Sequence, residues 1–164
     1  MKKCKAFIVF ILVCKFSICD AQQTDAKFHL EKLIYHASRC NGSCPEINIE
    51  IEKNKKIYVT RQIFKSKSEI DSEQSGTFNG RLKKTEYNKL ISLLKENNLD
   101  SLQFPISDCC DGSIKTLIVY YNGQRRYFKS MQPPDSTGDL FNLLKEIATN
   151  KKLKLTKINK MIEE

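Results

Sequence analysis

The chain has 164 residues, of which 40% are hydrophobic and 29% charged, and its formal net charge is +9. This length fits one domain, and with six glycines and four prolines the composition excludes a disordered chain. Nucleic-acid binding is not expected, because it needs arginines and aromatic residues on one surface in a compartment that contains nucleic acid, and neither condition is met.

The first 21 residues differ from the rest and predict a signal peptide. Three lysines within residues 2–5 precede a nearly unbroken apolar run over residues 6–14. Cys19 and Ala21 place small residues at the two positions that a signal peptidase reads, so Gln22 is the expected new N-terminus. The apolar run is shorter than the roughly 20 residues of a membrane span. We therefore expect export to the periplasm or the extracellular space.

Two alternatives remain for this segment. In one, it stays uncleaved as a weak membrane anchor; in the other, Cys19 carries a lipid that holds the protein at the envelope, although the bulky Ile18 stands where a lipobox has a small residue. Cleavage would remove four lysines and one aspartate and lower the formal charge from +9 to +6. The remaining surplus lies partly in the lysines of residues 151–160, which are typical of a solvated face. Weak attraction to anionic lipid or polysaccharide is the alternative.

Export also decides the expected state of the cysteines. Of the seven in the sequence, three leave with the signal peptide. The four that remain are Cys40, Cys44, Cys109 and Cys110. An even number of cysteines in an oxidising compartment predicts disulfides before any other use.

The first half of the mature chain predicts strands. A strand is expected over residues 28–35, followed by a loop over residues 38–45. Ile47, Ile49 and Ile51 then alternate with polar residues, which indicates a strand with one buried face and one wet face. A polar turn and a return strand over residues 57–63 complete a hairpin.

The middle of the chain predicts a polar loop over residues 65–76, a short strand over residues 77–82 and a first helix. Thr85 is the expected cap of that helix, and Glu86 suits its first turn. The helix should pack on a sheet through a stripe at i, i+3, i+4 and i+7, which consists of Tyr87, Leu90, Ile91 and Leu94.

The last part predicts a second hairpin and a second helix. Residues 116–121 and 124–128 flank Asn122-Gly123, the preferred two-residue turn. A break at Pro133-Pro134 precedes a helix whose apolar stripe is Leu140, Leu143, Leu144 and Ile147.

These elements predict an α+β fold, in which an antiparallel sheet of about five or six strands is built from hairpins and carries two helices on one face. The expected organisation is a signal peptide over residues 1–21, a single domain over residues 22–150 and a basic tail over residues 151–164 that forms a frayed helix.

No catalytic set is evident, and no nucleophile elbow, zinc-protease motif, phosphate loop or dinucleotide fingerprint occurs. His29 and His36 lie at or near the first strand, where a structural or surface role is expected. Asp108 and Asp111 flank the cysteine pair. Two carboxylates in a loop can serve as an acid/base couple or as calcium ligands, but they more often cap turns.

The residues alone leave the cysteine pairing open. A Cys40–Cys44 bridge would close a very small loop around Gly42, which can turn tightly at positive φ. It would shape the loop more than stabilise the domain, because even a 15-residue ring contributes only about 3 kcal/mol. A bridge from this loop to Cys109 or Cys110 would contribute about 4 kcal/mol or more. The spacing matches neither a thioredoxin-like redox motif nor the usual zinc ligands, so we expect no metal and no cofactor.

The loop resembles a known family. Residues 40–45, Cys-Asn-Gly-Ser-Cys-Pro, followed by the alternating strand over residues 47–51, are similar to the Cys-x-Gly-x-Cys-Pro signature of domain-of-unknown-function family 6438, a group of mostly exported bacterial proteins. The likeness spans roughly residues 33–148 and takes in Gly76 and Asp111. It implies an exported compartment and this fold, and it assigns no activity.

The chain departs from that family at Asn41, where an aromatic residue is common, and at Ile47, where a tyrosine is common. The Cys109-Cys110 pair is not part of the pattern. The resemblance implies that Cys40 pairs with Cys44, which leaves Cys109 and Cys110 free, bonded to each other or bonded to another molecule.

The functional expectation is a non-enzymatic periplasmic or secreted module, monomeric, that binds a protein or an envelope component and uses the loop over residues 40–45 as a rigid rim. One alternative is a small hydrolase or thiol-active enzyme that uses Asp108, Asp111 and the cysteines. Another is an inhibitor of an exported enzyme, in which the stiff loop plugs a cleft.

Overall fold

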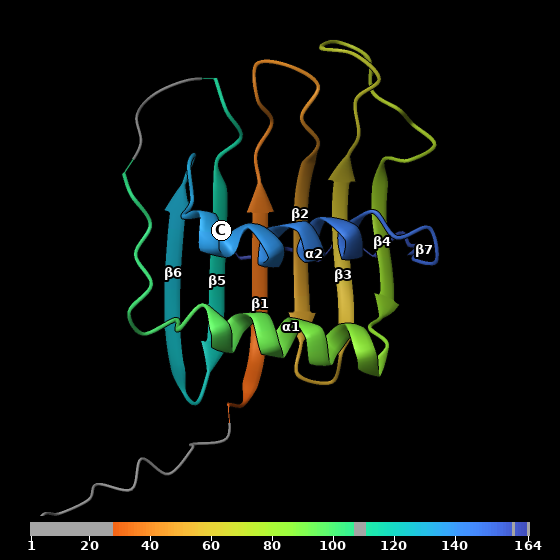
Figure 1. The fold of residues 1–164 in the computed structure, drawn as a ribbon. Coiled ribbons are helices and arrows are strands. Elements are labelled where there is room, and N and C mark those ends of the chain that lie inside the picture. Colours follow the sequence, from red (N-terminus) through yellow and green to blue (C-terminus); the bar gives the residue numbers. More distant parts are fainter. Residues whose placement is uncertain (1–27, 107–110, 159, 164) are drawn as a thin grey trace, which may run out of the picture.

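One antiparallel sheet carries the whole fold. The computed structural model describes residues 28–106, 111–158 and 160–163. Within them the sheet has seven strands in the order β6-β5-β1-β2-β3-β4-β7 (Figure 1). The strands are β1 (Leu30–Ala37), β2 (Glu46–Glu52), β3 (Lys56–Gln62), β4 (Gly76–Arg81), β5 (Lys115–Tyr121), β6 (Gln124–Ser130) and β7 (Lys154–Leu155).

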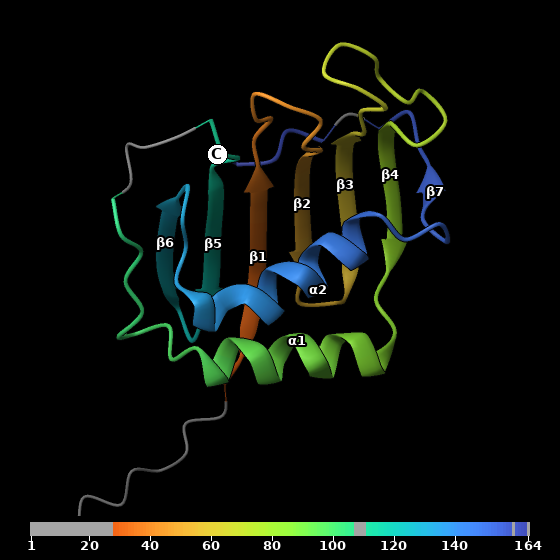
Figure 2. The same ribbon diagram turned by 45° about the horizontal axis from the view of Figure 1, so that its top comes forward.

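Two helices cover one face of the sheet. These are α1 (Lys84–Glu96) and α2 (Gly138–Ala148), and they lie side by side across the strands (Figure 2). All four residues of the predicted α2 stripe are buried, whereas only Leu90 and Leu94 of the predicted α1 stripe are. Helix α2 therefore lies deeper against the sheet than α1.

The expected cap at Thr85 is wrong. The cap is Lys83 and the helix begins at Lys84, two residues earlier than expected, and the side chain of Glu86 accepts a hydrogen bond from the backbone N–H of Lys83 at 2.8 Å. The glutamate reaches back over the first turn and satisfies a donor there, so a hydroxyl side chain at position 85 is not needed.

The alternation in β2 is confirmed. Ile47, Ile49 and Ile51 are fully buried between the sheet and the helices, as the period-2 pattern predicts. Strand β1 lies in the interior of the sheet between β2 and β5, and it is therefore covered by partners on both sides. It begins two residues later than expected, because the backbone N–H of His29 bonds to the Asn122 side chain instead of entering the ladder.

The second hairpin forms as predicted. Asn122 and Gly123 have φ values of 49° and 73°, so both central residues of the turn adopt the left-handed region that this pair favours. The turn fixes the register between β5 and β6, in which Tyr120 stands opposite Arg125 and Tyr121 opposite Gln124.

The end of the chain differs from the expectation. The sheet has seven strands instead of five or six, because β7 adds a two-residue edge that pairs with β4 and is too short to give a periodic pattern. The frayed helix expected over residues 151–164 is not found in the described part of that range, residues 151–158 and 160–163. After β7 the chain crosses the sheet on the face opposite the helices and ends near β5 (Figure 2).

Among the described residues, no helix is both long enough and apolar enough to cross a membrane. The predicted signal peptide lies outside those residues.

Candidate functional site

A disulfide closes the loop between β1 and β2. Cys40 and Cys44 are bonded, with their Cα atoms 5.4 Å apart. Gly42 does not take the positive φ expected for it, because a ring of five residues closes with ordinary backbone angles here. The two sulfur-bearing residues are half-buried, whereas Asn41 and Ser43 point into solvent. The ring therefore presents two polar side chains at its tip.

The segment before β5 braces this loop on one side. The backbone N–H of Asn41 donates to the Asp111 carbonyl at 3.1 Å, and the Asn41 side chain donates to the Asp111 carboxylate at 3.0 Å. Next to the ring, Ser38 exchanges backbone and side-chain hydrogen bonds with Ser113 and Ile114. Asp111 thus acts as a backbone brace, which is the common use of a loop carboxylate.

The loop between β3 and β4 braces the opposite side. The Arg39 guanidinium lies 4.5 Å from the centre of the Phe64 ring and donates a hydrogen bond to the Lys67 carbonyl. Three loops consequently meet at one end of the sheet, at the top of Figure 1, with the disulfide ring in the middle. A loop held from both sides loses little conformational freedom when it binds a partner.

The face of the sheet opposite the helices is polar and is built from three rows of side chains that follow the cross-strand pairs. The loop row, next to the disulfide ring, consists of Asn48, His36, Thr116 and Lys129. The middle row consists of Glu50, Ile34, Ile118 and Tyr127. The charged row consists of Glu52, Lys32, Tyr120 and Arg125.

A hollow of about 240 Å³ lies on this face beneath the disulfide loop. Ser38 and Glu46, which flank the loop in sequence, form part of its wall. The whole lining mixes hydrogen-bond donors and acceptors and consists of His36, Ser38, Glu46, Asn48, Ile114, Thr116, Tyr127 and Lys129. Its chemistry suits a polar ligand.

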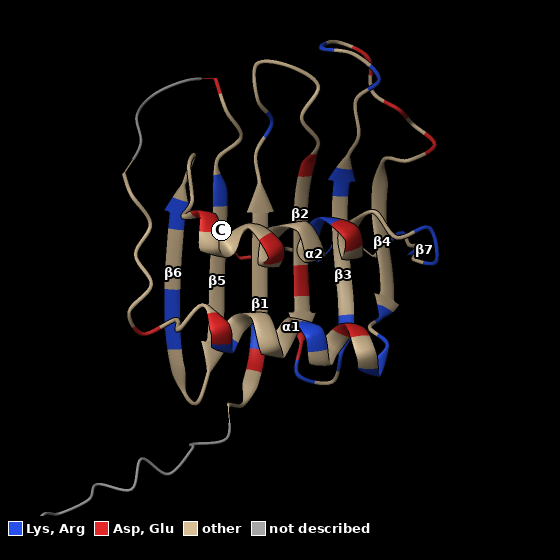
Figure 3. Cartoon of the chain, viewed as in Figure 1, with Lys and Arg blue, Asp and Glu red and all other residues tan. Residues whose placement is uncertain are grey.

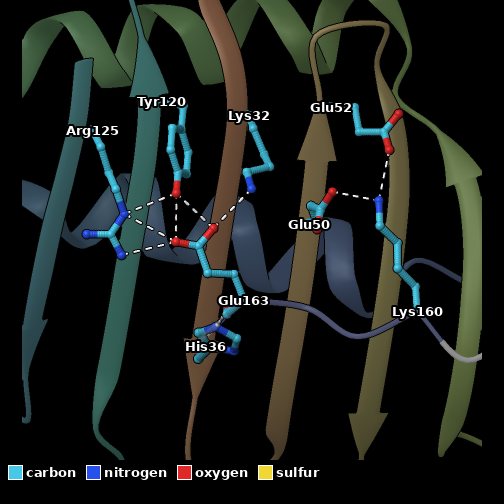
Figure 4. A network of polar contacts seen from close by, with 8 residues as sticks. All are labelled: Lys32, His36, Glu50, Glu52, Tyr120, Arg125, Lys160 and Glu163. Carbon is cyan, nitrogen blue, oxygen red and sulfur yellow. Dashed lines mark hydrogen bonds and ion pairs between the residues drawn. The ribbon is translucent and has the colours of Figure 1, made fainter. Parts of the chain in front are cut away.

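A carboxylate of the tail sits in the charged row. Lys32 lies 3.0 Å from one oxygen of Glu163, Arg125 lies 3.1 Å from the other, and the Tyr120 hydroxyl lies 2.7 and 2.8 Å from the two (Figure 4). The hydrogen bonds from Tyr120, Lys32 and Arg125 lower the pKa of Glu163 from its ordinary value of 4.5 to about 2. His36 Nε2 also donates to the Glu163 carbonyl at 2.6 Å.

A lysine of the same tail sits over the acidic strand. Lys160 Nζ lies 2.7 Å from the Glu50 carboxylate and 2.9 Å from that of Glu52, and it rests 4.3 Å from the Tyr58 ring centre (Figure 4). The hydrogen bond from Lys160 lowers the pKa of Glu52. The tail therefore makes one cationic and one anionic contact with the polar face.

The structure brings together some of the predicted site residues. Cys40, Gly42 and Cys44 share the ring, Pro45 follows it directly, and Asp111 is joined to it through Asn41. Asp108, Cys109 and Cys110 lie outside the described residues. His29 sits below β1 at the other end of the sheet, away from His36.

The charged row was not anticipated from the sequence. The Asn-Gly turn does fix Tyr120 opposite Arg125, so that pair was open to prediction. Lys32 and Glu163 carry no such signal, because their meeting depends on long-range strand pairing and on the path of the tail. Within residues 28–106, 111–158 and 160–163, no three His, Cys, Asp or Glu side chains are grouped to hold a metal ion.

The fold and the site define an α+β domain with a helix-covered antiparallel sheet and a disulfide-closed loop after its interior first strand. The sequence profile of the family described as "Domain of unknown function (DUF6438)" matches residues 31–150, and the chain belongs to this family. No curated protein matches the chain.

Proposed function

We propose that this protein is an exported, non-enzymatic module that binds a protein or envelope component through the disulfide loop and the hollow beneath it. The observation that carries the proposal is the bracing of the loop from both sides, by Asp111 and by Phe64, at the rim of a polar hollow. A disulfide is also typical of an oxidising, extracytoplasmic compartment.

The enzyme alternative rests on Asp108, Asp111, Cys109 and Cys110. Of these, the structure describes Asp111 alone, and its carboxylate accepts a hydrogen bond from the Asn41 side chain. That contact favours a bracing role over an acid/base role. The inhibitor alternative uses the same braced loop, so identification of the captured partner decides between it and an envelope component.

Export is tested by the mass of the native protein recovered from the envelope or medium. We expect a polypeptide that begins at Gln22, without lipid, and is at least 2 Da lighter than the fully reduced chain because one disulfide removes two hydrogens. The intact precursor, recovered from the cytoplasm with every thiol open to alkylation, would overturn the proposal.

The role of the loop is tested by replacing both ring cysteines with serine. The Cys40→Ser/Cys44→Ser chain should lose about 2 kcal/mol of stability at most, because the ring is small. It should also lose at least tenfold in capture of the envelope partner that the wild-type protein retains, because the loop tip is no longer rigid.

The matched control is Cys109→Ser/Cys110→Ser, which removes the other two cysteines of residues 22–164 and should keep that capture. Urea denaturation and a quantitative pull-down provide the two measurements. Equal capture by the wild type and the ring variant would show that the loop does not recognise the partner.

A further inference from the structure

The polar face carries opposite charges at its two ends. Lysine and arginine lie along β6, while glutamates lie along β2 (Figure 3). On the face away from the helices, Glu50 and Glu52 form an acidic end. Lys32 of β1 and Arg125 of β6, with the Tyr120 hydroxyl of β5 between them, form a basic end centred on β5, two strands from β2.

The tail fits this arrangement with a spacing of three residues. From β2 to β5 the face spans two strand spacings, about 9.6 Å in total at about 4.8 Å each. Three residues of extended chain reach about 10 Å. Lys160 therefore sits at the acidic end while Glu163 sits at the basic end, and the segment crosses the strands between them (Figure 4).

The centre of the face is apolar and needs a cover. Ile34 and Ile118 stand side by side in the middle row, on the face away from the helices, and both are 0% exposed. They do not belong to the core cluster between the sheet and the helices. Ile34 lies on β1, between β2, whose glutamates Lys160 contacts, and β5, whose Tyr120 contacts Glu163, so the face combines an apolar centre with charged ends.

The basic end is held in place by groups other than the tail. Arg125 Nε donates to the Tyr120 hydroxyl at 3.1 Å, and its guanidinium packs near the Tyr120 and Tyr127 rings. Lys32 Nζ lies 4.4 Å from the Tyr120 ring centre. These contacts preorganise the three donors, so a carboxylate that enters the site costs them little reordering.

The tail itself is weakly attached. Beyond Thr156, whose N–H bonds to Thr77, Lys160 and Glu163 make the hydrogen bonds and ion pairs between the described tail residues and the sheet. Met161, between them, is 94% exposed. Partly exposed ion pairs contribute about 0–1 kcal/mol each, so a competing segment can displace the tail.

We propose that the polar face is a peptide-binding site for an extended segment with a basic residue three positions before an acidic one, and that the tail occupies this site in the absence of a partner. The proposal rests on the proposed binding function and names the class of partner: a protein segment with this charge pattern, laid across β2, β1 and β5 as residues 160–163 are.

The test uses the full chain with Glu163→Gln, which loosens the tail and leaves the site intact. The probe is a dye-labelled peptide with the sequence of residues 156–164, followed by fluorescence anisotropy. The Glu163→Gln chain should bind the peptide at least tenfold more tightly than the wild type, because the wild-type tail competes at an effective concentration in the millimolar range.

Two controls locate the binding. Adding Arg125→Gln should weaken binding at least tenfold, whereas adding Lys65→Gln, which removes an equal charge from the exposed β3–β4 loop, should change it less than twofold. A peptide in which the Lys160 and Glu163 positions are exchanged should bind at least tenfold more weakly. Melting curves check that each variant is folded.

Acid provides an independent readout. The charged and titratable groups facing the carboxylate are Lys32 and His36 from β1, Tyr120 from β5 and Arg125 from β6. The pKa of this carboxylate is lower when the peptide is bound than when the peptide is free. The affinity for the peptide is therefore full above pH 4.5 and falls as the pH drops below it. At about pH 3.5 the loss should be about tenfold relative to a peptide with glutamine at this position.

The inference would be overturned if the Arg125→Gln substitution, or the replacement of the peptide's carboxylate by an amide, left the affinity unchanged. A folded Glu163→Gln chain that binds no peptide would also overturn it. If the wild type dimerised in a concentration-dependent way by exchanging tails, the natural occupant of the site would be a second copy of this chain. That result would also overturn the inference. If the peptide fails while the envelope partner is still captured through the disulfide loop, the inference falls and the proposed function stands. If instead the peptide binds as expected but capture of the envelope partner does not depend on the disulfide loop, the proposed role of the loop falls and the peptide-binding site stands.

Discussion

Replacing Arg61 with alanine is expected to lower the free energy of unfolding by about 3 kcal/mol. Arg61 lies in β3 on the helix-covered face and is only 7% exposed. Its Nε donates to the Gln74 carbonyl at 2.7 Å, and its Nη1 donates to the carbonyl of Ala148, the last residue of α2. The guanidinium also lies 4.1 Å from the Phe78 ring centre.

This loss is large because Arg61 is buried and donates to the carbonyl of a buried residue at the end of α2. Carbonyls at the end of a helix lack partners within it, and a cation there also interacts favourably with the helix dipole. Burial lowers the pKa of Arg61, but a guanidinium stays charged at neutral pH. Alanine would remove the donor to the carbonyl of the buried Ala148 and open a cavity beside Phe78.

The matched control is Arg81→Ala in β4. Arg81 also donates to a backbone carbonyl, that of Asn54 at 2.7 Å, but it is exposed to solvent. Water replaces that bond, so the expected loss is below about 0.5 kcal/mol. Arg61→Lys keeps the charge but loses the forked geometry of the guanidinium. Its loss of stability should therefore lie between those of Arg61→Ala and Arg81→Ala. Urea denaturation measures all three, and equal losses for the two alanine variants would contradict the bracing role of Arg61.

Replacing Ile49 with alanine should also lower the free energy of unfolding by about 3 kcal/mol. Ile49 lies in β2, is 0% exposed, and stands between Tyr35 of β1 and Val59 of β3. The loss combines the transfer free energy of the removed carbons with the cavity that the surrounding side chains cannot fill. Ile49→Val should cost about 1 kcal/mol, because it removes a single methylene.

The neighbouring residue on the other face provides the comparison. Asn48→Ala removes a side chain that points to the wet face and lies 2.7 Å from His36 Nδ1, so about 1 kcal/mol is expected at most. Denaturation curves for the two alanine variants should differ by about 2 kcal/mol. Curves that coincide would mean that the alternation in β2 does not separate a buried from a wet face.

Much of the fold follows from local signals. The Ile47–Ile51 alternation, the Asn122-Gly123 turn and the apolar stripe of α2 each depend on residues close in sequence, and each is confirmed. Strand β7 and the path of the tail are not predicted. A two-residue strand has no period, and the lysine-rich tail composition resembles a solvated helix until its partners on the sheet are known.

The candidate site also has one part that local sequence predicts and one part that depends on contacts between distant segments. The ring of Cys40 and Cys44 is a short-range feature, and the resemblance of its motif to a known family was enough to anticipate the pairing. Lys32, Tyr120 and Arg125 of the charged row come from β1, β5 and β6, and Glu163 of the tail, which they contact, stands 131 residues from Lys32 in sequence. No local pattern carries that information.

By itself the sequence determined the period of each long strand and helix, the turn that sets one hairpin register and the family to which the chain belongs, because these depend on neighbouring residues. The tertiary structure alone decided that Lys32, Tyr120 and Arg125 would converge on one carboxylate, that Arg61 would satisfy the end of α2, and that the tail would lie across the polar face. Such contacts form only when strand order and chain path bring distant segments together, and the free energy that selects that path belongs to the whole packed sheet.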